Sequence, residues 1–301
     1  MAANKKILVI RNDKLGDFML AWPALSLLKK QYPDSIVTVL LPSYTKPVAE
    51  ECPWIDNTIQ DDAHNGTVSD ALHLARLIKK FEFDASISLY SEMRTALALW
   101  LARIPERYGP ATKLAQLFLN KKLTQNRSLS LKPEYEYNTD LVRHFISSNG
   151  DIAANLPDPP YLRFEQAEIN ELRQSYINRY AIKSDRKLIF IHAGSGGSAI
   201  NLTLQQFAEL AKLIYKSNKV HFVITAGPDE LETANKLSEL LNSINHSVYH
   251  STEGLISFTK FISIGDLFIS GSTGPLHIAG ALNIATAAFY PARRSATPLR
   301  W

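Results

Sequence analysis

The sequence contains a single cysteine, Cys52, in 301 residues. One cysteine cannot build a disulfide framework or a cysteine-ligated metal cluster, and such scarcity fits a reducing compartment. Long apolar runs are missing as well. The run at residues 7–10 is far shorter than the ~20 residues of a transmembrane helix, and it is too short for a secretory signal. We therefore expect a cytoplasmic protein without a transmembrane segment.

A large excess of one charge is also absent, since 33 Lys and Arg residues face 29 Asp and Glu residues, a formal net charge of +4. This balance permits an anionic substrate or an acidic membrane surface, but it does not indicate a nucleic-acid binder. Glycine is scarce, and nine of its 13 residues follow residue 190. That skew predicts that backbone atoms bind a ligand in the second half of the chain.

Apolar strands and helices alternate along the chain, which predicts an open α/β sheet with ligands at the carboxyl ends of its strands. In the first half we expect strands at 5–10, 35–41 and 85–89, and helices at 17–30, 67–80 and 94–103. In the second half we expect strands at 187–192, 220–225 and 267–270, and helices at 165–180, 204–215, 230–241 and from about Pro275. A proline-rich segment at 152–160 separates the halves, and Thr203 with Gln206 predicts a capping box.

The loop at residues 11–17 follows the first strand and leads into a helix. Gly16 allows a tight turn there, and Asp17 falls in the first helical turn, where a carboxylate is favoured. One interpretation makes Asp17 a general base in a cleft between the domains. The other makes Asp17, or Asp13, a simple helix cap.

A second loop begins after the strand that ends at His192, and its glycines and serine suit a phosphate held by backbone N–H groups. The residues concerned are Gly194, Ser195, Gly196 and Gly197. An ordinary connection is the plain alternative. A hydrolase with Ser195 as nucleophile and Asp266 and His277 as partners is a further one, although the next helix begins too late for a nucleophile elbow.

A third loop follows the strand at 267–270 and enters a helix at Pro275, an early position that suits proline. Ser272 or Thr273 is expected to cap this helix, and the free N–H groups that begin at Gly274 would bind a diphosphate. His277 lies in the first turns, as a ligand contact or as a packing histidine. Glu230, which also follows a strand, would reach a ribose hydroxyl or cap its helix.

Basic residues recur in the first half, where they would face a phosphorylated acceptor or anionic lipid, or simply solvent. They are Arg94, Arg103, Arg107, Lys113, Lys121, Lys122 and Arg127. No cluster of histidines or acids has the spacing of a metal site, so no metal is expected.

Together, these loops resemble glycosyltransferase family 9, the ADP-heptose:lipopolysaccharide heptosyltransferases. The resemblance rests on Gly16-Asp17 after the first strand, on Trp22-Pro23-Ala24-Leu25, and on the runs 194–198 and 272–279. These features keep the family's order from residue 5 to about residue 290.

The resemblance implies a GT-B fold with two Rossmann-like domains facing a cleft, residues 1–160 for the acceptor and 161–301 for the nucleotide sugar. It implies inverting transfer of heptose or a related sugar, with ADP-heptose as the expected donor and a lipopolysaccharide core or lipid A acceptor at the inner face of the cytoplasmic membrane. No cofactor is expected. Asp17 is the implied general base. Donor binding is assigned to Gly194, Ser195, Gly196, Gly197, Glu230, Ser272, Thr273, Gly274 and His277, and acceptor binding to Lys14, Gly16 and Arg94.

Two residues depart from the family pattern. Ile200 stands where the family commonly has a lysine, and Ser272 stands where heptosyltransferases tend to have an aspartate. These departures leave two alternatives open: a weakened GT-B protein that binds sugar nucleotide or glycolipid, and a GT-B sugar-nucleotide epimerase. The chain ends at Trp301, so we also expect it to lack the C-terminal helix that usually crosses back to the first domain.

Overall fold

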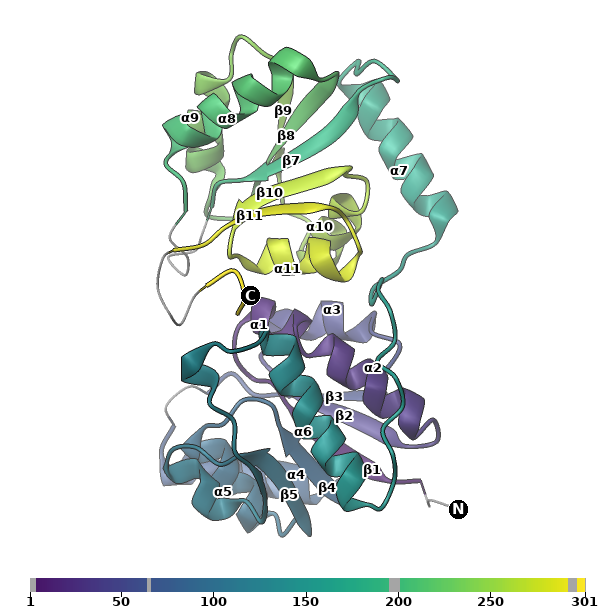
Figure 1. Ribbon diagram of the computed structural model, residues 1–301, viewed down its shortest axis with the longest axis vertical. Coiled ribbons are helices and arrows are strands. Elements are labelled where there is room, and N and C mark those ends of the chain that lie inside the picture. Colours follow the sequence, from purple (N-terminus) through teal and green to yellow (C-terminus); the bar gives the residue numbers. More distant parts are fainter. Residues whose placement is uncertain (1–3, 64–65, 195–200, 292–296, 301) are drawn as a thin grey trace. The chain divides into compact units, whose positions relative to one another are not determined.

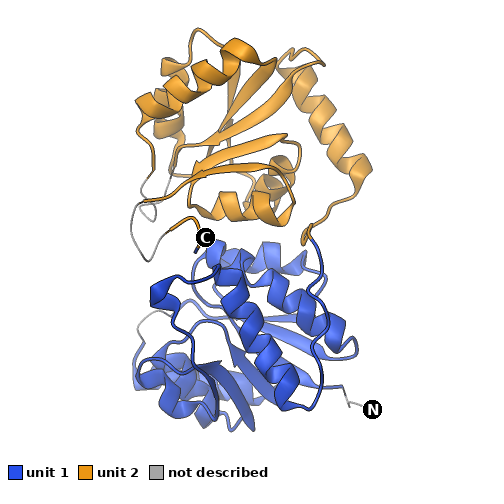
Figure 2. Cartoon of the chain, viewed as in Figure 1, with its two compact units in different colours: residues 1–158, 300 blue, residues 159–299, 301 orange. Residues whose placement is uncertain are grey.

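The computed structural model describes residues 4–63, 66–194, 201–291 and 297–300 (Figure 1). The chain divides into two units, one of residues 1–158 with Arg300 and one of residues 159–299 (Figure 2). The division falls within the proline-rich segment at 152–160. None of the described helices is long and apolar enough to span a membrane.

The first unit contains a parallel sheet in the order β3-β2-β1-β4-β5-β6. This is the strand order of a Rossmann fold. The central strands are continuous apolar runs because helices cover both of their faces. The strands are β1 (Lys6–Ile10), β2 (Ile36–Leu41), β3 (Asn57–Gln60), β4 (Ala85–Ser88), β5 (Glu106–Pro110) and β6 (Lys121–Leu123).

Successive side chains of β1 point to opposite faces of the sheet, and each face packs on a different pair of helices. Leu8 and Ile10 pack in the core beneath α4 (Val68–Lys79) and α5 (Met93–Leu101). The other face is covered by α2 (Trp22–Gln31) and α6 (Glu134–Ser148), which lie side by side in Figure 1. The shorter elements are α1 (Leu15–Met19), α3 (Lys46–Glu50) and the 3₁₀ helices Ser43–Thr45, Leu114–Phe118 and Arg127–Leu129.

The second unit contains a parallel sheet in the order β11-β10-β7-β8-β9. One face packs on α8 and α9 through Phe207 and Leu237, and the other packs on α10 through stacked rings such as Phe190 on Phe261. The strands are β7 (Lys187–His192), β8 (Val220–Ala226), β9 (His246–His250), β10 (Leu267–Gly271) and β11 (Thr286–Phe289). The helices are α7 (Gln166–Arg179), α8 (Leu204–Ser217), α9 (Leu231–Leu240), α10 (Leu255–Ile262) and α11 (Gly274–Ala281).

The predicted α/β class with parallel sheets is confirmed, and so is the capping box of Thr203 and Gln206. The single helix predicted at 17–30 is wrong. The chain forms α1 and α2 instead, separated by Leu20 and Ala21, because proline lacks the N–H that a helix interior needs. Pro23 therefore lies in the first turn of α2. The helices α3, α6 and α10 and the strands β3, β5, β6, β9 and β11 were not predicted from the sequence.

The end of the described chain returns to the first unit without a helix. Residues 297–300 form no helix. Arg300 nevertheless belongs to the first unit, where its carbonyl accepts a hydrogen bond of 2.8 Å from the Glu134 N–H.

Candidate functional site

The strand order of the first unit reverses between β1 and β4. In open parallel sheets, ligands bind beside the carboxyl ends of the strands at such a reversal. Arg11 follows β1 directly, and its Nη1 donates a hydrogen bond of 3.2 Å to the carbonyl of Leu89, which follows β4. One side chain therefore bridges the two strand ends at the point where a ligand is expected.

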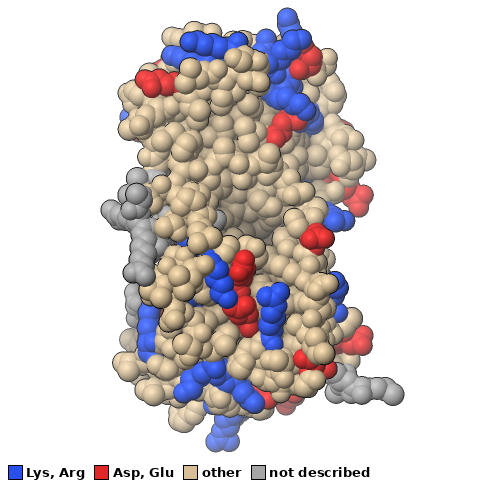
Figure 3. Space-filling model, viewed as in Figure 1, with Lys and Arg blue, Asp and Glu red and all other residues tan. Residues whose placement is uncertain are grey.

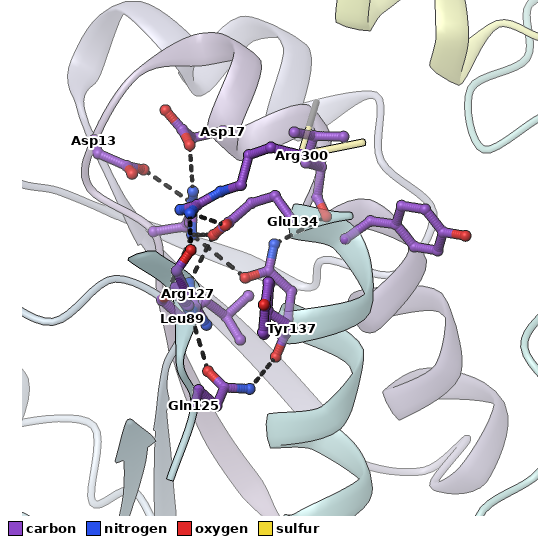
Figure 4. Close-up of polar contacts among 12 residues, drawn as sticks. Asp13, Asp17, Leu89, Gln125, Arg127, Glu134, Tyr137 and Arg300 are labelled. Carbon is purple, nitrogen blue, oxygen red and sulfur yellow. Dashed lines mark hydrogen bonds and ion pairs between the residues drawn. The ribbon is translucent and has the colours of Figure 1, made fainter. Parts of the chain in front are cut away.

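The Arg11 guanidinium is only 2% exposed and lies among three carboxylates. These belong to Asp13, Asp17 and Glu134, which are labelled in Figure 4. Arg11 Nη2 donates to Asp17 Oδ1 at 2.7 Å, its Nε lies 3.0 Å from Asp13 Oδ1, and its Nη1 lies 3.5 Å from Glu134 Oε1. Asn138 Oδ1 also accepts from Nη1, at 3.4 Å. This arrangement compensates a charge that would otherwise be very unfavourable in the interior.

Glu134 is the second centre of this network and is also 2% exposed. Arg127 Nη1 donates to its Oε1 at 2.6 Å, and Arg300 Nη2 lies 2.9 Å from its Oε2. With Arg11, three guanidinium groups therefore surround one carboxylate. Because Glu134 opens α6, the network joins the end of β1 to α6 and to the end of the chain.

Asp17 is held at one oxygen and remains partly accessible, with 19% of its side chain exposed. The helix-cap interpretation of Asp17 and Asp13 is wrong, because the N-cap residue of α1 is Lys14 and no side chain caps the helix. The Leu15 N–H instead donates to the Tyr44 hydroxyl at 2.9 Å. The ion pair with Arg11, rather than the helix terminus, fixes the position of the Asp17 carboxylate.

Asp13 has an unusual protonation equilibrium. Burial raises its pKa, Arg11 opposes the shift, the charge of Asp17 adds to it, and the resulting pKa is about 7. For Arg11, burial acts to lower the pKa, but Asp13, Asp17 and Glu134 more than offset it and the net shift is upward. Arg11 therefore stays charged while Asp13 titrates near neutrality.

The predicted acceptor residues lie in different environments. Lys14 is exposed and Gly16 is half-buried in α1. Arg94 is buried and makes a bidentate ion pair with Asp61, at 3.0 and 2.5 Å. Asn12 donates to the same carboxylate at 2.9 Å, so Arg94 ties α5 to the loops that follow β1 and β3.

In the second unit, the strand order reverses between β7 and β10, and a glycine at each strand end permits close contact. A Cβ on Gly194 would lie 2.2 Å from the Glu230 carboxylate, and a Cβ on Gly271 would lie 2.8 Å from Asn201 Oδ1. Asn201 in turn donates to the carbonyl of Ala193 at 3.2 Å. A larger residue at either position would therefore require the Glu230 or Asn201 side chain to move.

Glu230 lies beside Gly194 at this edge. It occupies the N-cap position of α9 without capping the helix, and its Oε2 accepts a hydrogen bond of 3.0 Å from the Gly227 N–H. His192 Nε2 is 3.4 Å from the same oxygen, and His192 Nδ1 is 3.0 Å from Thr225 Oγ1. Burial lowers the pKa of His192, although Glu230 opposes the shift.

The start of α11 carries the remaining predicted donor residues. Thr273 is the N-cap residue, as the sequence allowed, but its side chain makes no capping bond and pairs with Ser270 Oγ at 3.0 Å. Ser272, Gly274 and His277 lie beside it, partly exposed. Burial lowers the pKa of His277 to about 4, so its ring is neutral at pH 7. The first N–H groups of α11 thus have no cap from the Thr273 side chain.

Part of the predicted donor loop is outside the described residues, namely Ser195, Gly196, Gly197 and Ile200. The hydrolase alternative is wrong, because Asp266 precedes the amino end of β10, where it binds Arg173 and the Leu188 N–H. His277 follows the opposite end of that strand. Among the described residues, no group of three or more His, Cys, Asp or Glu is arranged to hold a metal ion.

Sequence reasoning missed the partners of Arg11 that are distant in the chain. Glu134 lies 123 positions away, and Arg300 is farther still. The sequence marks Arg127 only as one of several basic residues in the first half. The one local signal was that an arginine directly follows a buried strand, a place where a charge needs partners.

Comparison with known proteins identifies the family. The model of glycosyltransferase family 9 (heptosyltransferase) matches residues 71–298. The chain belongs to this family. A Haemophilus influenzae relative with only a provisional glycosyltransferase name is 45% identical over 297 residues, covering 99% of this chain and 85% of the relative.

Two further comparisons relate this family 9 chain to lipopolysaccharide heptosyltransferases. Lipopolysaccharide heptosyltransferase 2 of Escherichia coli is 25% identical over 307 residues, covering 97% of this chain and 85% of the relative. The structure of E. coli ADP-heptose lipopolysaccharide heptosyltransferase II has a TM-score of 0.76 at 22% identity, covering 98% of this chain and 87% of that one. The likeness confirms the predicted GT-B fold class.

Removing the charge of Glu134 should strongly destabilise the first unit. In Glu134→Gln, three arginines lose a buried anion, so we expect the free energy of unfolding to fall by about 3–5 kcal/mol. Urea unfolding followed by tryptophan fluorescence measures this, since Trp22, Trp54 and Trp100 lie in the first unit. The control Glu136→Gln, in the same helical turn, should change it by less than about 0.5 kcal/mol. Equal effects of the two variants would contradict the network.

Asp13→Asn should change how stability depends on pH. Between pH 4 and 7, folded Asp13 keeps a proton that the unfolded chain has lost, because its pKa rises from 3.8 to about 7. The contribution of Asp13 to the free energy of unfolding of the wild type therefore falls across this range. The free energy of unfolding of Asp13→Asn, taken relative to the wild type, should rise by on the order of 2–4 kcal/mol from pH 4 to 7. Above pH 7 this difference should stay constant. Asp34→Asn, at an exposed position, is the control. A difference that does not vary with pH would refute the assignment.

Proposed function

We propose that this family 9 protein is an inverting glycosyltransferase that moves heptose, or a related sugar, from ADP-heptose to a lipopolysaccharide core or lipid A acceptor. Family membership supports sugar transfer. The relatives named as lipopolysaccharide heptosyltransferases support the choice of sugar and acceptor. The proposal includes a cytoplasmic location, with the acceptor presented at the inner face of the membrane.

Asp17 is the proposed general base, and its geometry is the observation that carries the proposal. Arg11 fixes Asp17 Oδ1 at 2.7 Å, and the side chain remains partly exposed at the carboxyl edge of the sheet. In the proposed step, the acceptor hydroxyl gives its proton to Asp17 while its oxygen bonds to the anomeric carbon. The bond from that carbon to the nucleoside diphosphate breaks on the opposite face, so the configuration inverts.

The donor is proposed to bind in the second unit. The first N–H groups of α11, at Gly274 and beyond, suit the leaving diphosphate, and Ser272, Thr273 and His277 lie around them. Glu230 is proposed to accept a hydrogen bond from the ribose, beside Gly194. Ser195, Gly196 and Gly197 are assigned to the same site from the sequence alone.

The acceptor is proposed to bind in the first unit near Lys14 and Gly16, which are not buried. A direct contact from Arg94 is less well supported, because Asp61 already occupies its guanidinium. We therefore propose that Arg94 acts on the acceptor site by fixing the loop that contains Asn12.

Two alternatives make different predictions. Ser272, together with Ile200, motivates a weakened protein that binds a sugar nucleotide or a glycolipid without transfer, since both residues lack the charge common in the family. An epimerase would release product from the donor alone, with no acceptor present.

Asp17→Asn should abolish transfer without weakening donor binding. A general base contributes about 10²–10⁴-fold to the rate, so we expect a loss of at least ~100-fold in transfer from ADP-heptose to heptose-deficient lipopolysaccharide. The dissociation constant for the donor, measured by calorimetry, should stay unchanged. Asp34→Asn is the control.

The competing outcomes are distinct. Full activity of Asp17→Asn would mean that the base is another residue. Donor binding without transfer by the wild type would favour the binding protein, and product without acceptor would favour the epimerase. If none of the ADP-, GDP-, UDP- and dTDP-linked sugars binds, the transferase proposal fails.

A further inference from the structure

Large apolar side chains are exposed together on two adjacent elements of the first unit, α5 and the 3₁₀ helix Leu114–Phe118. Leu114 is 67% exposed, Leu117 is 71% exposed and Trp100 is 50% exposed. The Trp100 ring lies 5.9 Å from the Phe118 ring, measured between centroids. The three exposed side chains thus belong to neighbouring parts of one surface.

The geometry of the 3₁₀ helix explains why the leucines point outward. Side chains three residues apart lie on the same side of such a helix. Leu114 and Leu117 therefore share one face, while Ala115 and Phe118 share another. Ala115 is buried and Phe118 is partly buried against Trp100. The segment is anchored by one face and presents two leucines on the other.

Basic residues are frequent in the same stretch of the chain. Residues 100–123 contain five Lys or Arg residues and one acid, Glu106, so this stretch alone carries as much net positive charge as the whole chain. Arg103, Lys113 and Lys122 are exposed, and Lys121 lies 3.8 Å from Glu106. Figure 3 shows Lys and Arg side chains gathering at the lower end of the first unit, where Figure 1 places α5 and β5.

We propose that this surface, formed by Trp100, Leu114, Leu117, Lys113 and Lys122 and called here the Trp100 surface, docks on an anionic lipid bilayer. Tryptophan favours the membrane interface, leucines enter its apolar part, and lysines attract anionic headgroups while their stems cover apolar surface. A lipid partner is chosen because the exposed apolar side chains share this stretch with exposed lysines, whose charge complements anionic headgroups. The choice of lipid also rests on the proposed function, whose acceptor is a glycolipid.

Vesicle flotation tests this proposal, with vesicles of equal parts phosphatidylcholine and phosphatidylglycerol compared with pure phosphatidylcholine. The wild type should float with the anionic vesicles only, and less so at high salt. Leu114→Ser with Leu117→Ser should weaken binding by about tenfold or more, and Lys113→Gln with Lys122→Gln by about tenfold or more at low salt. The fluorescence of Trp100 should shift to the blue, a shift that Trp100→Phe removes.

Matched controls lie in the second unit. Leu213, at 62% exposure, and Lys216, also exposed, are both in α8, so Leu213→Ser and Lys216→Gln should bind as the wild type does. Circular dichroism checks that each variant is folded.

Three outcomes would overturn the proposal: a wild type that stays unbound, serine variants that bind like the wild type, or a solution dimer that the leucine substitutions dissociate. These vesicles contain neither donor nor acceptor, so their result does not test transfer. Transfer to detergent-solubilised acceptor tests the proposed function separately.

Discussion

The Arg11 guanidinium lies almost fully buried at the end of β1, where an uncompensated charge would cost several kcal/mol. Its compensation comes from parts of the chain that are far apart: Asp13 and Asp17 just after it, the Leu89 carbonyl after β4, and Glu134 at the start of α6. Each partner must stay in place for the charge to remain buried. The buried Arg11 charge therefore holds together the edge of the sheet at which the proposed reaction takes place.

The carboxyl edges of the two sheets are organised by different physical means. In the first, an ion-pair network orients one partly exposed carboxylate, Asp17. In the second, Gly194 and Gly271 let the Glu230 and Asn201 side chains lie close against the backbone, and the start of α11 has N–H groups that the Thr273 side chain does not cap. In the proposed function, the carboxylate would deprotonate the acceptor and the N–H groups would bind the departing diphosphate.

The local parts of this arrangement were predictable from the sequence. Apolar runs identified the central strands. Asp17 was predicted as the general base because it follows a strand and matches the family pattern. Short edge strands such as β6, with the sequence Lys-Lys-Leu, carry too little pattern to be detected. The roles of Glu134 and Arg300 depend on contacts across more than a hundred positions, which periodicity does not encode. The elevated pKa of Asp13 likewise arises from burial, which only the folded chain defines.

Hydrogen exchange in Arg11→Met tests the central claim most directly, because methionine keeps much of the side-chain length but removes the charge and its hydrogen bonds. If Arg11 holds this edge together, protection should fall jointly in peptides covering residues 11–20, 85–92 and 134–148. The strands β7 and β10 of the second unit should keep their protection and serve as the internal reference. Loss confined to residues 11–20, with α6 protected as in the wild type, would contradict the account.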